Sequence, residues 1–331
     1  MKALFIGGTG NISSAVSRLF VKYGVDLYHL TRGTQKPVEG VTPLTGDIKN
    51  TKEVLRLLEG HHWDVVVNWI AFVPSDVEAD FLLFKDKTRQ YIFISSASAY
   101  QKPALAGPIT ESTPLSNPFW DYSRNKIACE ELLMRYYREF NFPVTIVRPS
   151  LTYDTVIPLP IAAFKEYTTV DRMKKGLPVV VPGDGTSLWT TTHSADFAKG
   201  FYGISGDLRA IGEAFHVTSD EAMPWNYYYE AVGAALGVKP QLVHIPSDWL
   251  VGYAQKHNGP DLQGTLLGDK SHSAVFDNSK IKRFVPGYAA EVPFSRGIAE
   301  TIKWFEADAS RRIINEAHNR FLDEVIKVFR L

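Results

Sequence analysis

The sequence is poor in cysteine, in excess charge of either sign and in long apolar runs. Cys129 is the one cysteine among 331 residues, so no disulfide can form within the chain. Lys plus Arg and Asp plus Glu both number 36, so the chain as a whole has no electrostatic attraction for nucleic acid or an anionic membrane. No apolar stretch reaches the roughly 18 residues of a membrane-spanning helix. These absences favour a cytoplasmic protein without membrane contact, and they disfavour nucleic acid as a partner.

The chain also lacks the ligand clusters that mark a metal site. Its nine histidines include one adjacent pair, His61 and His62, and neighbours in sequence seldom face the same metal ion. No cysteine or carboxylate cluster accompanies this pair. His193 and Asp196 are three residues apart, which is typical of the start of a helix. We therefore predict that the protein has no metal site.

The first half of the chain alternates short apolar runs with amphipathic segments. The apolar runs have hydrophobic residues at consecutive positions, as parallel strands that are buried on both faces do. Alternation of strand and helix predicts a doubly wound parallel sheet. The expected strands are residues 3–6, 26–30, 64–70, 91–94 and 144–147, and the expected helices are 12–23, 51–58, 77–89 and 122–140.

The second half is less regular, because prolines interrupt it at positions 158, 160, 178 and 182. Helical periodicity returns at residues 196–202, 224–236, 294–307 and 311–329. We expect an α/β fold with a Rossmann-type doubly wound parallel sheet and a smaller, mixed C-terminal substrate lobe. The sheet domain would comprise residues 1–150 and about 188–218, and the lobe about 151–187 and 219–331. Ligands of such sheets bind at the carboxyl ends of the strands, so the site should lie between the two parts.

The first expected strand leads into a glycine-rich loop, Gly7-Gly8-Thr9-Gly10-Asn11-Ile12-Ser13. Gly7 permits a tight turn, and Gly10 lets the backbone approach a pyrophosphate, which the N-terminus of the following helix attracts. The last position of this motif is usually glycine; Ser13 is small enough to keep most of the helix–strand packing. Since a strand precedes the loop and a helix follows it, the motif predicts a dinucleotide site. The expected contacts are Gly7, Thr9, Gly10, Asn11 and Ile12.

The end of the second strand bears on the choice of dinucleotide. A carboxylate there would hold the ribose hydroxyls of NAD, but the sequence has Arg32, which suits the 2′-phosphate of NADP. We favour NADP and keep NAD as the alternative, in which Arg32 is a surface residue. Asp47 and Ile48 follow the third strand and are candidates for the adenine; Asp47 is equally typical of a helix N-terminus. Ala71 is a further candidate cofactor contact.

Tyr122 and Lys126 are four residues apart at the start of an expected helix, which places them on one helical face. A nearby ammonium group stabilises a phenolate and lowers the pKa of the phenol, so the tyrosine can exchange a proton with a substrate hydroxyl. Lys126 would also hold the cofactor ribose. The fifth strand ends in Ser95 and Ser96, where a serine hydroxyl can bond the reacting oxygen; strand-end capping is the alternative role.

These elements together resemble the short-chain dehydrogenase/reductase superfamily, in its extended NAD-dependent epimerase/dehydratase branch. The resemblance implies Tyr122 as acid/base, Lys126 as its activator and ribose ligand, and Ser96 as donor to the substrate oxygen. It also implies a homodimer through helices that match residues 77–89 and 122–140. The matching residues are Gly7, Gly10, Asp47, Ser96 to Tyr100, Tyr122, Lys126, Arg148-Pro149, Pro182 to Gly185 and His193 to Asp196.

The sequence departs from the branch at its substrate residues. The nucleotide-sugar dehydratases carry Asp-Glu where this chain has Ala97-Ser98, so we do not expect 4,6-dehydration. The epimerases have an asparagine near Ser150 and an arginine on the diphosphate near Trp189. Loss of both anchors disfavours a UDP-sugar, and an aromatic surface suits an uncharged sugar face. The expected substrate is a sugar or polyol derivative, with Ser98, Ser150 and Trp189 as substrate contacts.

We therefore expect an NAD(P)-dependent oxidoreductase or epimerase that acts on a hydroxyl or carbonyl group. The alternative is a non-catalytic, RNA-binding member of the same fold family. A chloroplast RNA-binding type within this group resembles the chain around residues 276–281. That type has generally lost the Tyr-x-x-x-Lys pair, which this chain keeps, and the balanced charge also counts against RNA binding.

Overall fold

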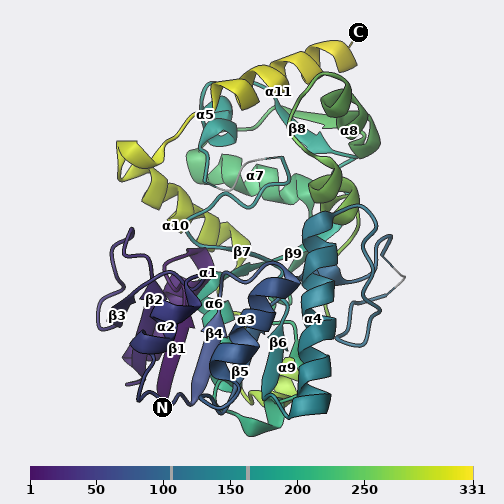
Figure 1. Cartoon of the computed structure of the whole chain (residues 1–331). Coiled ribbons are helices and arrows are strands. Elements are labelled where there is room, and N and C mark those ends of the chain that lie inside the picture. Colours follow the sequence, from purple (N-terminus) through teal and green to yellow (C-terminus); the bar gives the residue numbers. More distant parts are fainter. Residues whose placement is uncertain (105–106, 162–164, 331) are drawn as a thin grey trace.

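A computed structural model describes residues 1–104, 107–161 and 165–330. Its central feature is a parallel seven-stranded sheet in the order β10-β6-β5-β4-β1-β2-β3 (Figure 1). The order reverses beside β1, as in dinucleotide-binding sheets, and the reversal opens a crevice at the carboxyl ends of β1 and β4. The strands are β1 (Lys2–Ile6), β2 (Asp26–Thr31), β3 (Thr42–Thr45), β4 (Val65–Asn68), β5 (Tyr91–Ile94), β6 (Val144–Val147) and β10 (Ala214–Phe215).

Helices cover both faces of this sheet, which is why its central strands are buried and mostly apolar. Ala3 and Phe5 of β1 pack with helices α1 (Asn11–Lys22) and α6 (Ser194–Ile204). Leu4 and Ile6 point to the opposite face and pack with three other helices. These are α2 (Thr51–Leu57), α3 (Pro74–Phe84) and α4 (Asp121–Phe140).

The rest of the chain lies over the carboxyl ends of the sheet, in the upper half of Figure 1. It contains a three-stranded sheet of β7 (Leu151–Tyr153), β9 (Leu188–His193) and β11 (Ala222–Pro224). A parallel pair is formed by β8 (Val179–Pro182) and β12 (Leu242–Ile245). The helices are α5 (Thr168–Lys174), α7 (Trp225–Leu236), α8 (Ser247–Lys256), the π-helix η3 (Gln263–Lys270), α10 (Phe294–Glu306) and α11 (Glu316–Phe329). The short helix α9 (Ser279–Phe284) returns to the large sheet and packs beside α6 in the lower half of Figure 1. Short 3₁₀ turns are η1 (Ala97–Ala99), η2 (Leu208–Ala210) and η4 (Ala309–Arg311).

The predicted fold class, a Rossmann-type doubly wound sheet with a smaller mixed C-terminal part, is confirmed. We propose the same division into lobes as the sequence suggested, with residues 1–150 and about 188–218 in the sheet domain. None of the described helices is long and apolar enough to cross a membrane.

Several element boundaries differ from the prediction for local reasons. The strand expected to reach residue 70 ends at Asn68, whose side chain accepts a hydrogen bond from the backbone N–H of Ile70 at 2.8 Å. The helix expected at 77–89 begins three residues earlier, at Pro74, a residue suited to a first helical turn. The segment 311–329 is split, because Asn315 caps α11 by accepting from the His318 N–H. His193 caps α6 as predicted, since its Nδ1 accepts from the Ala195 N–H at 3.3 Å.

Candidate active site

A cavity of about 790 Å³ lies at the carboxyl ends of β1, β4 and β5. The glycine-rich loop lines it, together with Ser96, Tyr122 and Lys126. Residues from the second half of the chain, among them Trp189 and Phe276, complete its wall. The predicted cofactor loop, the predicted catalytic residues and the C-terminal part therefore line one cavity, as in ligand sites of this architecture.

The glycine loop has the backbone conformation that only glycine adopts readily. Gly7 and Gly8 have φ angles of +94° and +107°. Gly10 is the N-cap of α1, and its N–H donates to the Ser13 hydroxyl at 2.8 Å. The first turn of α1 contains no acidic residue, so its free N–H groups and positive dipole end suit a phosphate. Ser13, at the motif's last position, is thus a loop-fixing residue as well as a small one.

Sequence reasoning missed His29, which supports this loop from β2. A Cβ atom at Gly8 would lie 2.5 Å from Cε1 of the His29 ring, so the ring fills the space beneath the loop. Its Nε2 pairs with the Ser17 hydroxyl at 2.9 Å. Burial lowers the pKa of His29 to about 4, so the ring is neutral at physiological pH. The signal that could have revealed it is a polar residue inside an otherwise buried strand beside β1.

Lys126 is buried and held by the backbone. Its Nζ donates to the carbonyl oxygens of Ala71 at 2.6 Å and Ile94 at 2.8 Å, at the ends of two neighbouring sheet segments. The Nζ also lies 4.6 Å from the Phe72 ring centroid and 5.7 Å from that of Tyr122. Burial lowers the pKa of Lys126 to about 8, while the Cys129, Asp76 and Glu130 side chains raise it.

Tyr122 lies at the start of α4 and contacts the serines that end β5. Burial raises the pKa of its phenol above the ordinary value, a hydrogen bond with Ser96 lowers it, and the Asp269 carboxylate raises it. The net shift of the Tyr122 pKa is therefore upward and not downward as expected, because burial has the largest effect. At neutral pH the phenol is protonated and is a hydrogen-bond donor.

Three serines beside Tyr122, namely Ser96, Ser98 and Ser123, are linked by hydrogen bonds. The Ser96 and Ser98 hydroxyls lie 2.9 Å apart, and Ser123 of α4 donates to the Ser98 Oγ at 2.7 Å. Asn117 donates to the Ser98 carbonyl at 2.9 Å. Ser96 and Ser98 thus form a fixed polar edge of the cavity, and Ser96 is the member that lowers the Tyr122 pKa.

The predicted cofactor contacts fall into two groups. Thr9, Gly10, Asn11 and Ile12 line the cavity with Gly7. The Asn11 amide also donates to the Thr152 carbonyl at 3.0 Å, which ties the loop to β7.

Arg32 and Asp47 are exposed and, with the half-buried Ile48, lie outside the cavity lining. The Asp47 carboxylate accepts from the Lys49 N–H at 3.0 Å, a turn-capping contact. Ala71 participates through its carbonyl, which accepts from Lys126. The cofactor roles of all these residues remain predictions.

The three predicted substrate contacts, Ser98, Ser150 and Trp189, all line the cavity. Ser150 donates its hydroxyl proton to the Thr190 carbonyl at 2.9 Å, so it offers a ligand only acceptor capacity. Trp189 is buried and stacks on Trp225 with ring centroids 5.1 Å apart. Its Nε1 has no hydrogen-bond partner among the described residues.

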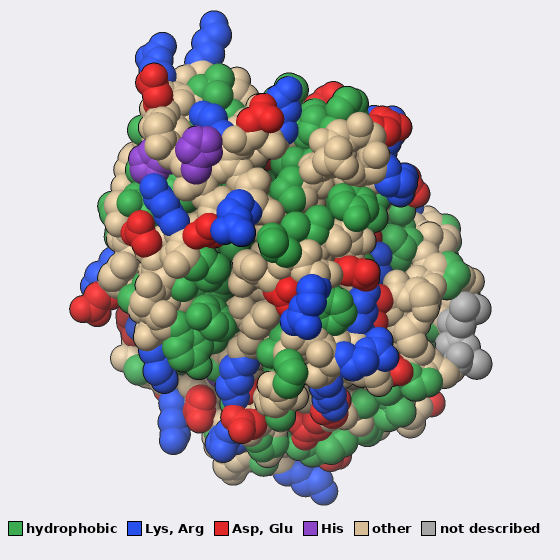
Figure 2. Space-filling view, turned by 90° about the horizontal axis from the view of Figure 1, so that it is seen from below, with side chains coloured by type: hydrophobic (Ala, Val, Ile, Leu, Met, Phe, Trp, Pro, Cys, Tyr) green, Lys and Arg blue, Asp and Glu red, His purple; other side chains and the backbone are tan. Residues whose placement is uncertain are grey.

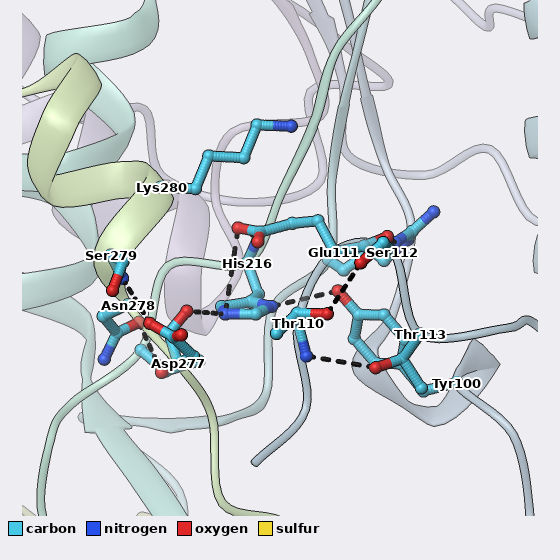
Figure 3. Close-up of polar contacts among 12 residues, drawn as sticks. Tyr100, Thr110, Glu111, Ser112, Thr113, His216, Asp277, Asn278, Ser279 and Lys280 are labelled. Carbon is cyan, nitrogen blue, oxygen red and sulfur yellow. Dashed lines mark hydrogen bonds and ion pairs between the residues drawn. The ribbon is translucent and has the colours of Figure 1, made fainter.

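A buried network next to the cavity holds the C-terminal segment in place (Figure 3). The Tyr100 hydroxyl lies 3.0 Å from His216 Nδ1, and His216 Nε2 lies 2.8 Å from the Asp277 carbonyl. Since a carbonyl only accepts, Nε2 carries the proton and Nδ1 accepts from the tyrosine. Two lysines of the following helix are paired: Lys280 with Glu213 at 2.6 Å and Lys282 with Asp220 at 2.8 Å. Hydrogen bonds and ion pairs therefore attach the segment 276–281 to β10 and to the residues beside it.

Sequence reasoning also missed cavity residues that come from irregular segments. Phe72 and Trp120 flank Tyr122, with ring centroids 6.2 and 4.9 Å from its ring. Lys102, Asp269 and Lys270 bring three charged groups to the same cavity. No spacing rule marks these residues, because they follow strand or helix ends whose path depends on tertiary packing.

Residues 81–217 match the model of the NAD dependent epimerase/dehydratase family. The chain is 28% identical over 261 residues to the chloroplast stem-loop binding protein of 41 kDa b of Arabidopsis thaliana, covering 73% of this chain and 65% of that protein. It is 24% identical over 342 residues to a dTDP-glucose 4,6-dehydratase of Xanthomonas campestris, covering 92% and 91%. Because such dehydratases are among the relatives, the comparisons do not support the predicted exclusion of 4,6-dehydration.

Solved structures of nucleotide-sugar dehydratases and epimerases share the fold of this chain. The dTDP-glucose 4,6-dehydratase from Bacillus anthracis, in complex with NAD, superposes with a TM-score of 0.72 at 17% identity over 94% of this chain and 98% of that one. The UDP-glucuronic acid 4-epimerase from Bacillus cereus, also in complex with NAD, gives 0.68 at 19% identity over 93% and 99%. The predicted resemblance to the NAD-dependent epimerase/dehydratase family is confirmed by the match of residues 81–217 to the family model and by the fold of these neighbours.

Proposed function

We propose that the protein is an NAD(P)-dependent oxidoreductase or epimerase that acts on a hydroxyl or carbonyl group of a sugar or related small molecule. The observation that carries the proposal is the convergence of the glycine loop, Tyr122, Lys126 and Ser96 on one cavity. A bound nicotinamide dinucleotide would supply the hydride acceptor or donor. The loop fits such a group, because its backbone is open to the cavity and no acidic side chain stands in the first turn of α1.

Lys126 is placed to bind the cofactor ribose and to orient the Tyr122 hydroxyl. An ammonium group has three N–H donors, and two of them bond the Ala71 and Ile94 carbonyls. One donor remains for a ribose hydroxyl or for the Tyr122 oxygen. Ile94 ends β5 and Ala71 lies three residues beyond β4, so these two carbonyls hold the ammonium group at the edge of the sheet.

Tyr122 and Ser96 are placed to handle the proton of the reacting oxygen. The phenol is protonated at neutral pH, so it can donate a proton to a carbonyl oxygen as that oxygen gains negative charge. The Ser96 hydroxyl, held by the serine cluster, would donate a second hydrogen bond to the same oxygen. In the opposite direction Tyr122 must first lose its proton, which a neighbouring cation favours.

The cofactor and the substrate are narrower proposals. Structural neighbours hold NAD, whereas Arg32 favours NADP if its exposed side chain reaches a 2′-phosphate. The dehydratase and epimerase among the named proteins act on nucleotide sugars, which supports a sugar substrate. Net oxidoreduction or epimerisation remains our proposal over dehydration, because Ala97 and Ser98 provide no carboxylate at the position after Ser96.

The test is Tyr122→Phe, assayed with dTDP-glucose, UDP-glucose and unmodified sugars in the presence of NAD or NADP. Turnover should fall by about a thousandfold, in the range of losing a general acid–base group. Dinucleotide affinity should stay within about twofold, since the phenol ring is kept. Wild-type turnover in this variant would refute the assignment of Tyr122, and Tyr23→Phe, an exposed tyrosine on the far end of α1, serves as the control.

The relative named for stem-loop binding favours RNA binding as a second candidate. Against it, Lys280 and Lys282 are paired with carboxylates. Figure 2 also shows basic and acidic side chains intermingled on the face it views, without a single-sign patch. Salt-dependent RNA binding that Tyr122→Phe leaves unchanged would favour this candidate.

We also propose a homodimer through the helix pair α3 and α4. Leu82 and Phe140 present large apolar side chains on these helices, with exposed fractions of 65% and 57%. Exposed apolar residues on adjacent helices are typical of a contact surface.

A further inference from the structure

Ser123 follows Tyr122 directly in α4, and the proposed proton transfer gives it no role. Its side chain is completely buried, with an exposed fraction of 0%. Its hydroxyl donates to the Ser98 Oγ at 2.7 Å. Because Ser98 lies in η1, just after β5, this bond connects the helix that carries Tyr122 with the turn that begins at Ser96.

The direction of this bond determines where the Ser98 proton lies. A serine hydroxyl has one proton to donate and two lone pairs that can accept. The Ser98 Oγ accepts from Ser123, and the Ser96 Oγ, at 2.9 Å, is the one acceptor that the described residues offer to the Ser98 proton. The Ser98 hydroxyl therefore donates to Ser96.

The Ser96 oxygen then has both of its lone pairs occupied. It accepts from the Ser98 hydroxyl and, at 3.2 Å, from the Ser98 backbone N–H. Its own proton must therefore point away from Ser98, and the half-buried Ser96 side chain lines the cavity. Ser96 also opposes the upward shift of the Tyr122 pKa. This is the effect of a hydrogen-bond donor, because a donor stabilises the phenolate.

The backbone holds the two cavity serines in this arrangement. Ser96 is the N-cap of η1, and its carbonyl accepts from the Ala99 N–H at 3.1 Å. The buried Asn117 side chain donates to the carbonyls of Ser98 and Gly268, at 2.9 and 2.7 Å. The turn that carries Ser96 and Ser98 is thereby attached to the π-helix η3, which fixes its distance from α4.

We propose that Ser123 and Ser98 are positioning residues, whose hydrogen bonds direct the Ser96 proton at the substrate oxygen that exchanges a proton with Tyr122. We call the chain from Ser123 through Ser98 to Ser96 the serine relay; its hydroxyls orient one another, and no O–H bond breaks. The Ser96 donor is then in place before negative charge develops on the substrate oxygen, so it need not reorient during the reaction.

This inference rests on the proposed function, since it takes Ser96 as a donor to the reacting oxygen. It also changes the role of Ser98, which the sequence predicted as a substrate contact. Because the Ser98 proton is donated to Ser96, Ser98 has no proton left to donate to a substrate.

The kinetic test is a set of double-mutant cycles on kcat, with the sugars and dinucleotides used for Tyr122→Phe. Ser96→Ala should lower kcat about a hundredfold, as the loss of one donor to a developing negative charge does. Ser98→Ala and Ser123→Ala should each lower kcat about tenfold and keep dinucleotide affinity within about twofold. In the Ser96→Ala background neither substitution should lower kcat further, because the relay acts only through Ser96.

Ser205→Ala is the matched control, since the Ser205 hydroxyl at the end of α6 donates to the Phe201 carbonyl at 2.7 Å, the length of the Ser123 bond. This variant should keep the wild-type kcat. Ser123→Thr retains a donor hydroxyl and should recover most of the kcat that Ser123→Ala loses. Thermal unfolding of each variant verifies the fold.

The proton arrangement can also be tested without a substrate. Neutron diffraction from wild-type crystals soaked in heavy water locates the deuterium atoms of the three hydroxyls. We expect the Ser123 deuterium to point at the Ser98 Oγ, the Ser98 deuterium at the Ser96 Oγ and the Ser96 deuterium into the cavity. A Ser96 deuterium that points at the Ser98 Oγ would overturn the relay.

The results distinguish a failure of the relay from a failure of the proposed function. Wild-type kcat in Ser98→Ala or Ser123→Ala, or a loss that multiplies with that of Ser96→Ala, would overturn the relay alone, provided that Tyr122→Phe is inactive. Wild-type turnover in Tyr122→Phe, or binding of neither NADH nor NADPH, would refute the proposed function. The neutron map would in that case still support or overturn the arrangement of the serine protons.

Discussion

Lys126 is buried, bonds two backbone carbonyls and keeps one N–H donor for a ligand. Its substitution should therefore weaken both ligand binding and turnover. Lys126→Met keeps the apolar stem and removes all three N–H groups. We expect dinucleotide affinity to fall at least tenfold and turnover to fall further, because the ribose and the Tyr122 oxygen both lose a donor. Fluorescence titration with NADH and NADPH measures the affinity.

The matched control is Lys165→Met, since Lys165 also lines the cavity but is exposed. The free protein should also bind dinucleotide less well as pH rises past about 8, where Lys126 loses its proton. Lys126→Met should not show that pH dependence. Wild-type affinity in Lys126→Met would contradict the assigned role.

At the scale of single residues, the sequence predicts a site residue only where its spacing from another residue places both on the same face of a helix or strand. Tyr122 and Lys126 were identifiable because residues four apart share a helical face. Lys102, Asp269 and Lys270 were not, because the chain folds them together from segments about 167 residues apart that have no periodicity. The upward shift of the Tyr122 pKa could not be predicted from the sequence either, because it depends on burial and on the charge of Asp269, which lies nearby only in the folded chain.

At the scale of elements, α3 is attached to the sheet through a buried carboxylate. Asp80 Oδ2 accepts from Asn68 Nδ2 of β4 at 2.6 Å and from the Tyr91 hydroxyl of β5 at 2.5 Å. Asp80 Oδ1 has no partner among the described residues. Burial raises the pKa of Asp80 to about 7 from its ordinary value of 3.8, and the two hydrogen bonds oppose this shift.

This pKa predicts a pH-dependent stability. The folded state favours the protonated acid. The contribution of Asp80 to the free energy of unfolding is therefore largest below about pH 4, and it falls as the pH rises to about 7, by at most about 1.4 kcal/mol per pH unit. Asp80→Asn keeps the acceptor oxygen without a charge and should lack this loss. Urea unfolding of both proteins at pH 5, 6, 7 and 8 should show the variant's advantage growing with pH and levelling off near pH 7.

The control is Asp86→Asn, an exposed aspartate just beyond α3. It should unfold with the pH dependence of the wild type. Parallel stability curves for wild type and Asp80→Asn would show that Asp80 titrates normally in the folded protein.

The elements of the first half were predictable because consecutive apolar residues mark strands that are covered on both faces. Residues 91–94 and 144–147 match β5 and β6 without change. The strands of the second half are two to six residues long and include exposed positions, so their pattern is too weak to recognise. The π-helix η3 has no propensity signature at all; it is shaped around Trp120, whose ring would collide with a Cβ at Gly264.

At the scale of the whole molecule, the proposed dimer depends on the apolar surface of α3 and α4. Leu82→Asp combined with Phe140→Asp places charges in that surface, and we expect the dimer to dissociate into folded monomers. Sedimentation velocity measures the change, and circular dichroism verifies the fold. As the control, Leu55→Asp and Leu208→Asp alter apolar residues that are similarly exposed elsewhere. A wild type that sediments as a monomer would contradict the proposal.

The order of the sheet and the lobe above it place every proposed group around one cavity, and the central claim is that a nicotinamide dinucleotide binds there. The most direct measurement is titration of the purified chain with NADH and NADPH, after denaturation of a sample to identify any retained nucleotide. The account predicts one dinucleotide per chain, bound with nearly equal affinity by wild type and Tyr122→Phe and more weakly by Lys126→Met. Preference for NADPH that Arg32→Ala abolishes would support NADP, and retained NAD would support an epimerase cycle. Binding of neither dinucleotide, with no nucleotide retained, would contradict the central claim.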